Sequence, residues 1–171
     1  NEQAVDGAKS LLEDETDFHR KVQYIFYRQW RNLKEYANKN GVEIIGDLPI
    51  YVAHDSADVW GNPKQFELDD DCNPVRVAGV PPDGFSREGQ LWGNPVFDWE
   101  YMRKDGYHWW IRRLEHSLNL YDKIRIDHFR GFSSYYAVPY GMPNAVNGMW
   151  LKGPGIEFFK TIESIIGKPD I

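Results

Sequence analysis

The sequence contains little cysteine, no long hydrophobic run and no excess of positive charge. Cys72 is the only cysteine among 171 residues, which excludes an intramolecular disulfide and a zinc cluster built from cysteines. No segment reaches the run of about 18 apolar residues that a membrane-spanning helix needs, and no signal-peptide core stands at the N-terminus. The formal net charge of −6 gives no basic surface for nucleic acid or an anionic membrane. We therefore expect a cytoplasmic protein with a neutral ligand and neither nucleic acid nor membrane as partner.

Aromatic residues, by contrast, are abundant. They make up 15% of the chain and include seven tryptophans and ten tyrosines. Inside helices such residues fill a core, because large rings bury much apolar surface. In loops they can instead stack on the C–H face of a sugar ring. The length suits one domain, whereas a complete eight-stranded β/α barrel needs roughly 250 residues.

Hydrophobic periodicity predicts helices and strands in alternation. The first helix is capped by Thr16 or Asp17 and stopped by Gly41, and its apolar stripe is expected to be buried. Residues 1–15 are polar and acidic and are expected to be disordered or loosely attached. The predicted elements are a helix over about 17–37, a strand at 43–47, helical pieces over 102–118, a strand at 123–127 and a helix over 156–166.

This order predicts an α/β fold that is part of a β/α (TIM) barrel. Strands separated by helices pair in parallel through crossover connections, and both predicted strands end in an aspartate, at the end where such barrels hold their active sites. A long loop-rich insertion covers residues 52–97, with a short strand near 75–77, and residues 130–152 are expected to be irregular. The domain prediction is therefore a polar segment at 1–16 and a partial barrel at 17–171, where residues 169–171 open a severed third strand.

Arg125 and Asp127 are the most suggestive pair for chemistry. They lie two apart on a strand, so their side chains share one face. A guanidinium beside a carboxylate favours the ionised acid, which a carboxylate nucleophile requires together with weak solvation. An ordinary buried ion pair has the same spacing.

Residues 125–132 read Arg-Ile-Asp-His-Phe-Arg-Gly-Phe. This run resembles the segment of the α-amylase clan that carries the catalytic nucleophile, and its second half narrows the resemblance to the 4-α-glucanotransferases (amylomaltases) of glycoside hydrolase family 77. Three further segments are similar to that family in the same order. They are residues 46–60, which begin Gly-Asp-Leu-Pro-Ile-Tyr-Val-Ala, the proline-rich loop at 79–95, and residues 150–155.

The resemblance implies a retaining transfer of α-1,4-glucan segments between maltooligosaccharides, with glucose as an acceptor. Asp127 would be the nucleophile that forms a covalent glucosyl-enzyme, and Arg125 would orient it and keep it ionised. A retaining mechanism also needs an acid/base carboxyl group. The family's glutamate lies in an Ala-Glu-Asp-Leu-Gly run that this sequence does not contain, so we expect the chain alone to be inactive.

The resemblance also implies a substrate-binding set. Asp47 would support the donor site, and His128 would lie near the donor sugar, although a structural imidazole fits the sequence equally. In the proline-rich loop, Phe85, Gln90 and Trp92 would contact the acceptor and Asp83 would bond sugar hydroxyls; the alternative is that they only hold the loop together. No cofactor and no metal ion are expected.

Two other functions are compatible with these residues. One is a hydrolase of the α-amylase clan, which the proline-rich loop disfavours, and the other is a non-catalytic glucan-binding piece. An incomplete parallel sheet also has open edges, so we expect the chain to self-associate.

Overall fold

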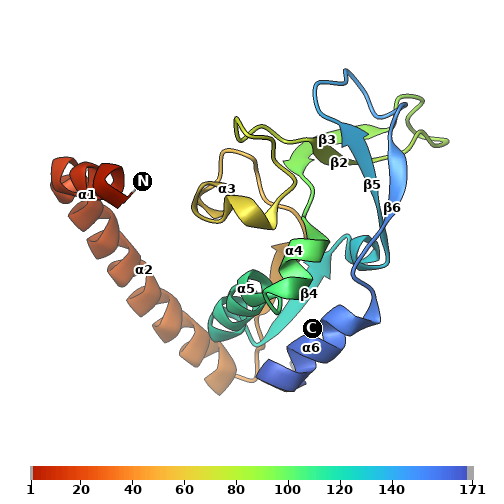
Figure 1. The fold of residues 1–171 in the computed structure, drawn as a ribbon. Helices are drawn as coiled ribbons and strands as arrows, with labels where there is room; N and C mark the ends of the chain where they lie inside the picture. Colours follow the sequence, from red (N-terminus) through yellow and green to blue (C-terminus); the bar gives the residue numbers. More distant parts are fainter. Residues whose placement is uncertain (1, 169–171) are drawn as a thin grey trace.

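The computed structural model describes residues 2–168 and shows a mixed α/β fold with one parallel and one antiparallel sheet (Figure 1). The predicted third strand at 169–171 lies outside the described residues. The helices are α1 (Glu2–Leu11), α2 (Glu13–Lys39), α3 (Ala57–Gly61), α4 (Trp99–Lys104), α5 (His108–Leu120) and α6 (Ile156–Ile166), with short 3-10 turns η1 (Pro63–Gln65) and η2 (Phe129–Phe132). The strands are β1 (Ile45–Pro49), β2 (Arg76–Val80), β3 (Gln90–Pro95), β4 (Lys123–Asp127), β5 (Ser134–Pro139) and β6 (Met149–Lys152).

The two aspartate-bearing strands pair in parallel, as the sequence predicts. β4 has its predicted bounds, whereas β1 lies two residues later than predicted. Ile44 precedes the strand, and its carbonyl accepts bonds from the backbone N–H groups of Asp122 and Lys123. Leu48 pairs with Ile126, and both are buried on the side that faces α5. The alternate residues of each strand therefore point to the opposite side.

The antiparallel sheet has the strand order β3-β2-β5-β6, and it corrects the prediction that residues 130–152 are irregular. β2 confirms the strand expected near 75–77. It pairs with β5, which follows β4 in the sequence, and Val77 stands opposite Val138. Four successive residues of β5 are buried. Because both faces of this strand are covered, it lacks the alternation that reveals a strand in a sequence.

Aromatic rings form the core between the two sheets and helices α4 to α6. The Phe132 ring lies 4.8 Å from the Phe158 ring and 5.3 Å from the Trp110 ring, centroid to centroid. Phe97 packs on Trp110 at 5.6 Å, and all four side chains are at most 1% exposed. Core filling thus accounts for these aromatic residues.

Helix α2 differs most from its prediction. It begins at Glu13 rather than at 16 or 17, α1 precedes it, and residues 2–15 are therefore mostly helical instead of disordered. None of its side chains is buried, and Phe18 is 62% exposed. An amphipathic pattern identifies a helix and its apolar face, but it does not show what covers that face. Within residues 2–168, no helix is both long and apolar enough to cross a membrane.

Polar contacts attach the C-terminal half of α2 to the parallel sheet. Asp122, just before β4, accepts bonds from the Lys34 ammonium at 2.8 Å, the Asn38 amide at 2.9 Å and the Ile44 backbone N–H at 2.8 Å. The Trp30 indole N–H donates to the Leu120 carbonyl at 2.9 Å. Asp122 therefore connects α2, the start of β1 and the start of β4.

We expect Asp122→Asn to destabilise the chain near neutral pH and to have little effect at pH 2. The bonds from Lys34, Ile44 and Asn38 lower the pKa of Asp122 from 3.8 to about 2. A carboxyl group whose pKa falls on folding stabilises the fold above its unfolded pKa, and this contribution is lost as the pH falls through the folded value. Urea unfolding at pH 6 and at pH 2 measures the change, with Asp71→Asn as an exposed control. An equal effect of Asp122→Asn at both pH values would contradict this account.

Candidate active site

Three charged side chains lie together on one face of β1 and β4, the last of them at the carboxyl end of β4. The Arg125 Nε atom lies 3.0 Å from Asp47 Oδ1, and its Nη2 atom lies 2.9 Å from Asp127 Oδ1. The parallel register places Asp47 opposite Arg125 and Pro49 opposite Asp127. All three side chains point away from the helix-facing side of the sheet, since the residues between them are the buried ones. One guanidinium thus bridges two carboxylates on one face.

This face is open to solvent, contrary to the weakly solvated pair expected from the sequence. The side chains of Arg125, Asp47 and Asp127 are 64%, 63% and 60% exposed. Within residues 2–168 the parallel sheet has only two strands, so no further strand faces these groups. Water therefore screens the ion pairs, and they contribute little to stability.

The proline-rich loop orders itself with its own polar groups. Asp83 Oδ1 accepts bonds from the backbone N–H groups of Phe85 and Ser86, each at 2.8 Å. The Phe85 side chain is fully exposed, at 103%. This carboxylate oxygen therefore serves the turn, which agrees with the alternative that part of the loop set holds the loop together.

Strand β3 carries the other two loop residues toward the end of β4. The Trp92 indole N–H donates to the Gln90 Oε1 atom at 3.0 Å. The Trp92 ring meets the His128 ring edge to face, with centroids 4.9 Å apart and an interplanar angle of 86°. Trp92 thus packs on the residue that directly follows Asp127, whereas within residues 2–168 no hydrogen bond or ring contact connects Asp83 or Phe85 with Trp92 or His128.

His128 adopts a left-handed backbone conformation directly after the predicted nucleophile, with φ 52° and ψ 42°. This turn ends β4 and starts η2. Partial burial lowers the pKa of the imidazole, the Asp127 carboxylate opposes this change, and the Arg130 guanidinium adds to it. His128 is therefore mainly neutral at physiological pH.

Sequence reasoning missed two aromatic contacts around this site. Tyr51 lies behind Trp92 and His128, although the segment that contains it was singled out for its resemblance. The Arg130 guanidinium lies 4.4 Å from the centroid of the Trp150 ring. Both contacts join segments far apart in the sequence, and no local pattern indicates such pairings.

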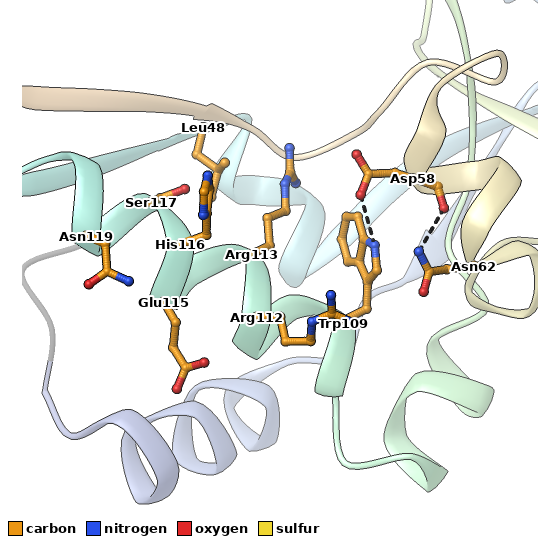
Figure 2. Close-up of a pocket in the computed structure, with 10 residues that line it drawn as sticks. All are labelled: Leu48, Asp58, Asn62, Trp109, Arg112, Arg113, Glu115, His116, Ser117 and Asn119. Atoms are coloured by element: carbon orange, nitrogen blue, oxygen red, sulfur yellow. Dashed lines mark hydrogen bonds between the residues drawn. The ribbon is translucent and has the colours of Figure 1, made fainter. Parts of the chain in front are cut away.

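A hollow of about 610 Å³ lies elsewhere, against α5 and α3 (Figure 2). Leu48 lines it, so it opens on the helix-facing side of β1, opposite the three charged residues. Inside it, Asp58 accepts a bond from the Trp109 indole N–H at 3.2 Å (Figure 2). None of the predicted site residues lines this hollow. In the described part of the chain, no cluster of three or more histidine, cysteine, aspartate or glutamate residues is arranged to hold a metal ion.

Comparison with known proteins identifies the family. A sequence model of the family described as 4-alpha-glucanotransferase matches residues 1–171. The 4-alpha-glucanotransferase of Streptococcus pneumoniae is 51% identical over 168 residues, which are 98% of this chain and 33% of that protein. The Aquifex aeolicus 4-alpha-glucanotransferase is 55% identical over 151 residues, which are 88% of this chain and 31% of that protein. The chain thus spans about a third of the length of these relatives.

A solved structure agrees with the sequence relatives. Amylomaltase from Streptococcus agalactiae, in complex with acarbose, matches the whole chain and 34% of its own chain with a TM-score of 0.96 and 46% identity. The fold, the ordered motifs and the sequence relatives therefore lead to one assignment. The chain belongs to the 4-α-glucanotransferase family.

Proposed function

We propose that this chain carries the nucleophile side of a retaining 4-α-glucanotransferase active site, and that β1 and β4 are neighbouring strands of a β/α barrel. One observation carries this proposal: Asp47, Arg125 and Asp127 meet on one face of two parallel strands, opposite the helix layer, and Asp127 stands at the carboxyl end of its strand. In β/α barrels the reacting groups come from this end of the strands.

In the proposed reaction an Asp127 oxygen attacks the anomeric carbon of an α-1,4-linked glucose unit. The bond from that carbon to the leaving 4-oxygen breaks, and the oxygen takes a proton from a second carboxyl group, which a retaining mechanism requires roughly 5 Å from the first. The 4-hydroxyl group of an acceptor sugar then attacks the same carbon. Its proton returns to the second carboxyl group, and Asp127 leaves as a carboxylate, so the α configuration is retained.

Arg125 has two roles in this proposal. Its guanidinium donates to one oxygen of Asp127 and so orients the carboxylate, and its second contact, with Asp47, limits the directions in which the guanidinium can turn. Asp47 thereby supports the donor site through Arg125. His128, adjacent to the nucleophile, borders the same sugar as a neutral imidazole.

The acceptor sugar is proposed to lie along β3 and the loop before it. Trp92 is 37% exposed, so part of its indole ring is open to a pyranose, and Gln90 lies beside it. Phe85 offers a second, fully exposed ring. Asp83 Oδ1 holds the turn, so Oδ2 is the oxygen of Asp83 that is proposed to accept a bond from a sugar hydroxyl. The proposed ligands are α-1,4-glucans and maltooligosaccharides, with glucose as acceptor.

A chimera tests the proposal, with this chain replacing the matching third of the Streptococcus pneumoniae relative. Incubated with maltotriose, it is expected to make longer and shorter oligosaccharides while the number of reducing ends stays constant. Hydrolysis adds one reducing end for each bond broken, so a steady rise in the number of reducing ends would favour the hydrolase alternative.

Trp92→Ala in the same chimera is expected to raise the KM for the glucose acceptor roughly tenfold, since a stacking contact is lost. No redistribution of maltotriose by the folded chimera would contradict the proposal.

Cytoplasmic location and self-association remain proposals as well. The exposed apolar side chains of α2 support self-association, because such surface is normally covered in solution.

A further inference from the structure

Tyr51 lies where the donor and acceptor sides of the proposed site meet. It follows β1 by two residues, and its ring centroid lies 6.3 Å from that of Trp92 and 6.4 Å from that of His128. The last two rings touch each other edge to face. The three rings come from three separate segments: the end of β1, strand β3 and the end of β4.

Tyr51 is the anchored member of this group. Its side chain is 7% exposed and stacks on Phe97, with centroids 5.7 Å apart and an interplanar angle of 24°. Phe97 is 1% exposed and belongs to the main aromatic core. Burial raises the pKa of the Tyr51 phenol, which is therefore neutral at any physiological pH. The ring thus extends the rigid core up to the site.

Trp92 and His128 have fewer anchors of their own. The hydrogen bond of Trp92 goes to Gln90 on the same exposed strand, so it does not tie the ring to the core. The His128 imidazole makes ring contacts with Tyr51 and Trp92 but no hydrogen bond among residues 2–168. Packing against the buried Tyr51 ring is therefore the contact that ties both rings to the core.

Gly131 allows the η2 turn to approach Ile50 and His128 closely. A Cβ atom at this position would lie 2.6 Å from the Ile50 Cδ1 atom and 3.4 Å from the His128 Cδ2 atom. The η2 turn after the nucleophile therefore packs directly on the residues that end the β1 segment. The His128 ring therefore borders Gly131 as well as the rings of Tyr51 and Trp92.

We propose that Tyr51 is a positioning residue that holds His128 and Trp92 as one unit beside Asp127, so that the donor and acceptor sugars are aligned with each other. The inference deepens the proposed function and rests on it for the roles of the two rings. The contacts themselves are independent of that function, and they are tested separately.

Solution NMR of the chain tests the positioning. In Tyr51→Leu the His128 imidazole loses part of its cover, so its pKa is expected to rise toward 6.5, since burial is the largest cause of its depression. The charged neighbours Asp127 and Arg130 stay in place, and the Trp92 indole N–H resonance should shift with the loss of the ring. Tyr51→Phe keeps the ring and is expected to leave both signals unchanged. His108, an exposed residue at the start of α5, is the control imidazole.

Two results would overturn the proposal. One is a folded Tyr51→Leu variant in which the pKa of His128 and the Trp92 resonance are both unchanged. The other, which needs no variant, is the absence in the wild-type chain of cross-relaxation between the Tyr51 ring protons and those of Trp92 and His128. The second measurement decides the question if Tyr51→Leu does not fold.

The chimera gives the functional readout. Tyr51→Leu is expected to lower kcat/KM for transfer to glucose by about tenfold to a hundredfold, because a misplaced site loses rate steeply, and Tyr51→Phe should restore it. Full activity in a Tyr51→Leu chimera with displaced rings would refute the alignment of the sugars. An inactive wild-type chimera would instead refute the proposed function, while the NMR results would still decide the positioning.

Discussion

Asp127→Asn is expected to lower the rate of glucan transfer by the chimera about 10⁴-fold or more. The amide has nearly the shape of the carboxylate, so the contact with Arg125 can persist in part. Its oxygen is a poor nucleophile and carries no charge to stabilise the cationic sugar of the transition state. The initial rate of maltotriose redistribution gives the size of the loss. The variant is incubated for a long time, because its slow reaction stays in the initial phase.

Asp47→Asn is the matched control. It removes the same charge from the neighbouring strand and weakens the other contact of the same guanidinium. Because Asp47 acts through Arg125 in the proposal, its replacement should cost far less than the loss of the nucleophile. Equal losses for the two variants, or substantial activity in Asp127→Asn, would mean that the nucleophile has been assigned to the wrong residue.

Phe132→Ala is expected to lower the free energy of unfolding of the chain by about 3–5 kcal/mol. The side chain is 1% exposed, and its ring packs on Phe158, Phe159 and Trp110 at centroid distances of 4.8, 5.2 and 5.3 Å. Removing it leaves a cavity at the junction of η2 with α5 and α6, which rigid neighbours fill only in part. Urea unfolding at pH 7 measures the change.

Phe129→Ala, in the same turn, shows whether burial is the cause. Phe129 is 53% exposed and packs mainly on Phe159, at 5.2 Å. The same atoms are removed, but about half of the side-chain surface already faces water, so the loss should be clearly smaller. If both variants lost the same stability, the effect would arise from the backbone of the turn and not from the buried ring.

Local patterns were sufficient for the elements whose two sides differ. β4 has its predicted bounds because buried isoleucines alternate with charged residues, and α6 has its predicted range because its apolar stripe ends at Gly167. The same kind of pattern failed for β5, which is buried on both faces, and for residues 2–15, where the side chains whose burial is described, at 3 and 5–15, include no buried one to mark the helices. Periodicity reports a difference between two faces, and it is silent where no difference exists.

The order of the motifs along the chain determined the family, and spacing alone placed Arg125 and Asp127 on one face of a strand. Tertiary structure decided the rest of the site. Asp47 reaches Arg125 only through the register of β1 against β4, and Tyr51, Trp92 and His128 meet only because the Trp92 ring of β3 packs on the residues that follow both strands. Side-chain alternation is a property of one strand, whereas register and ring packing depend on contacts between segments tens of residues apart, which form only when the whole core is assembled.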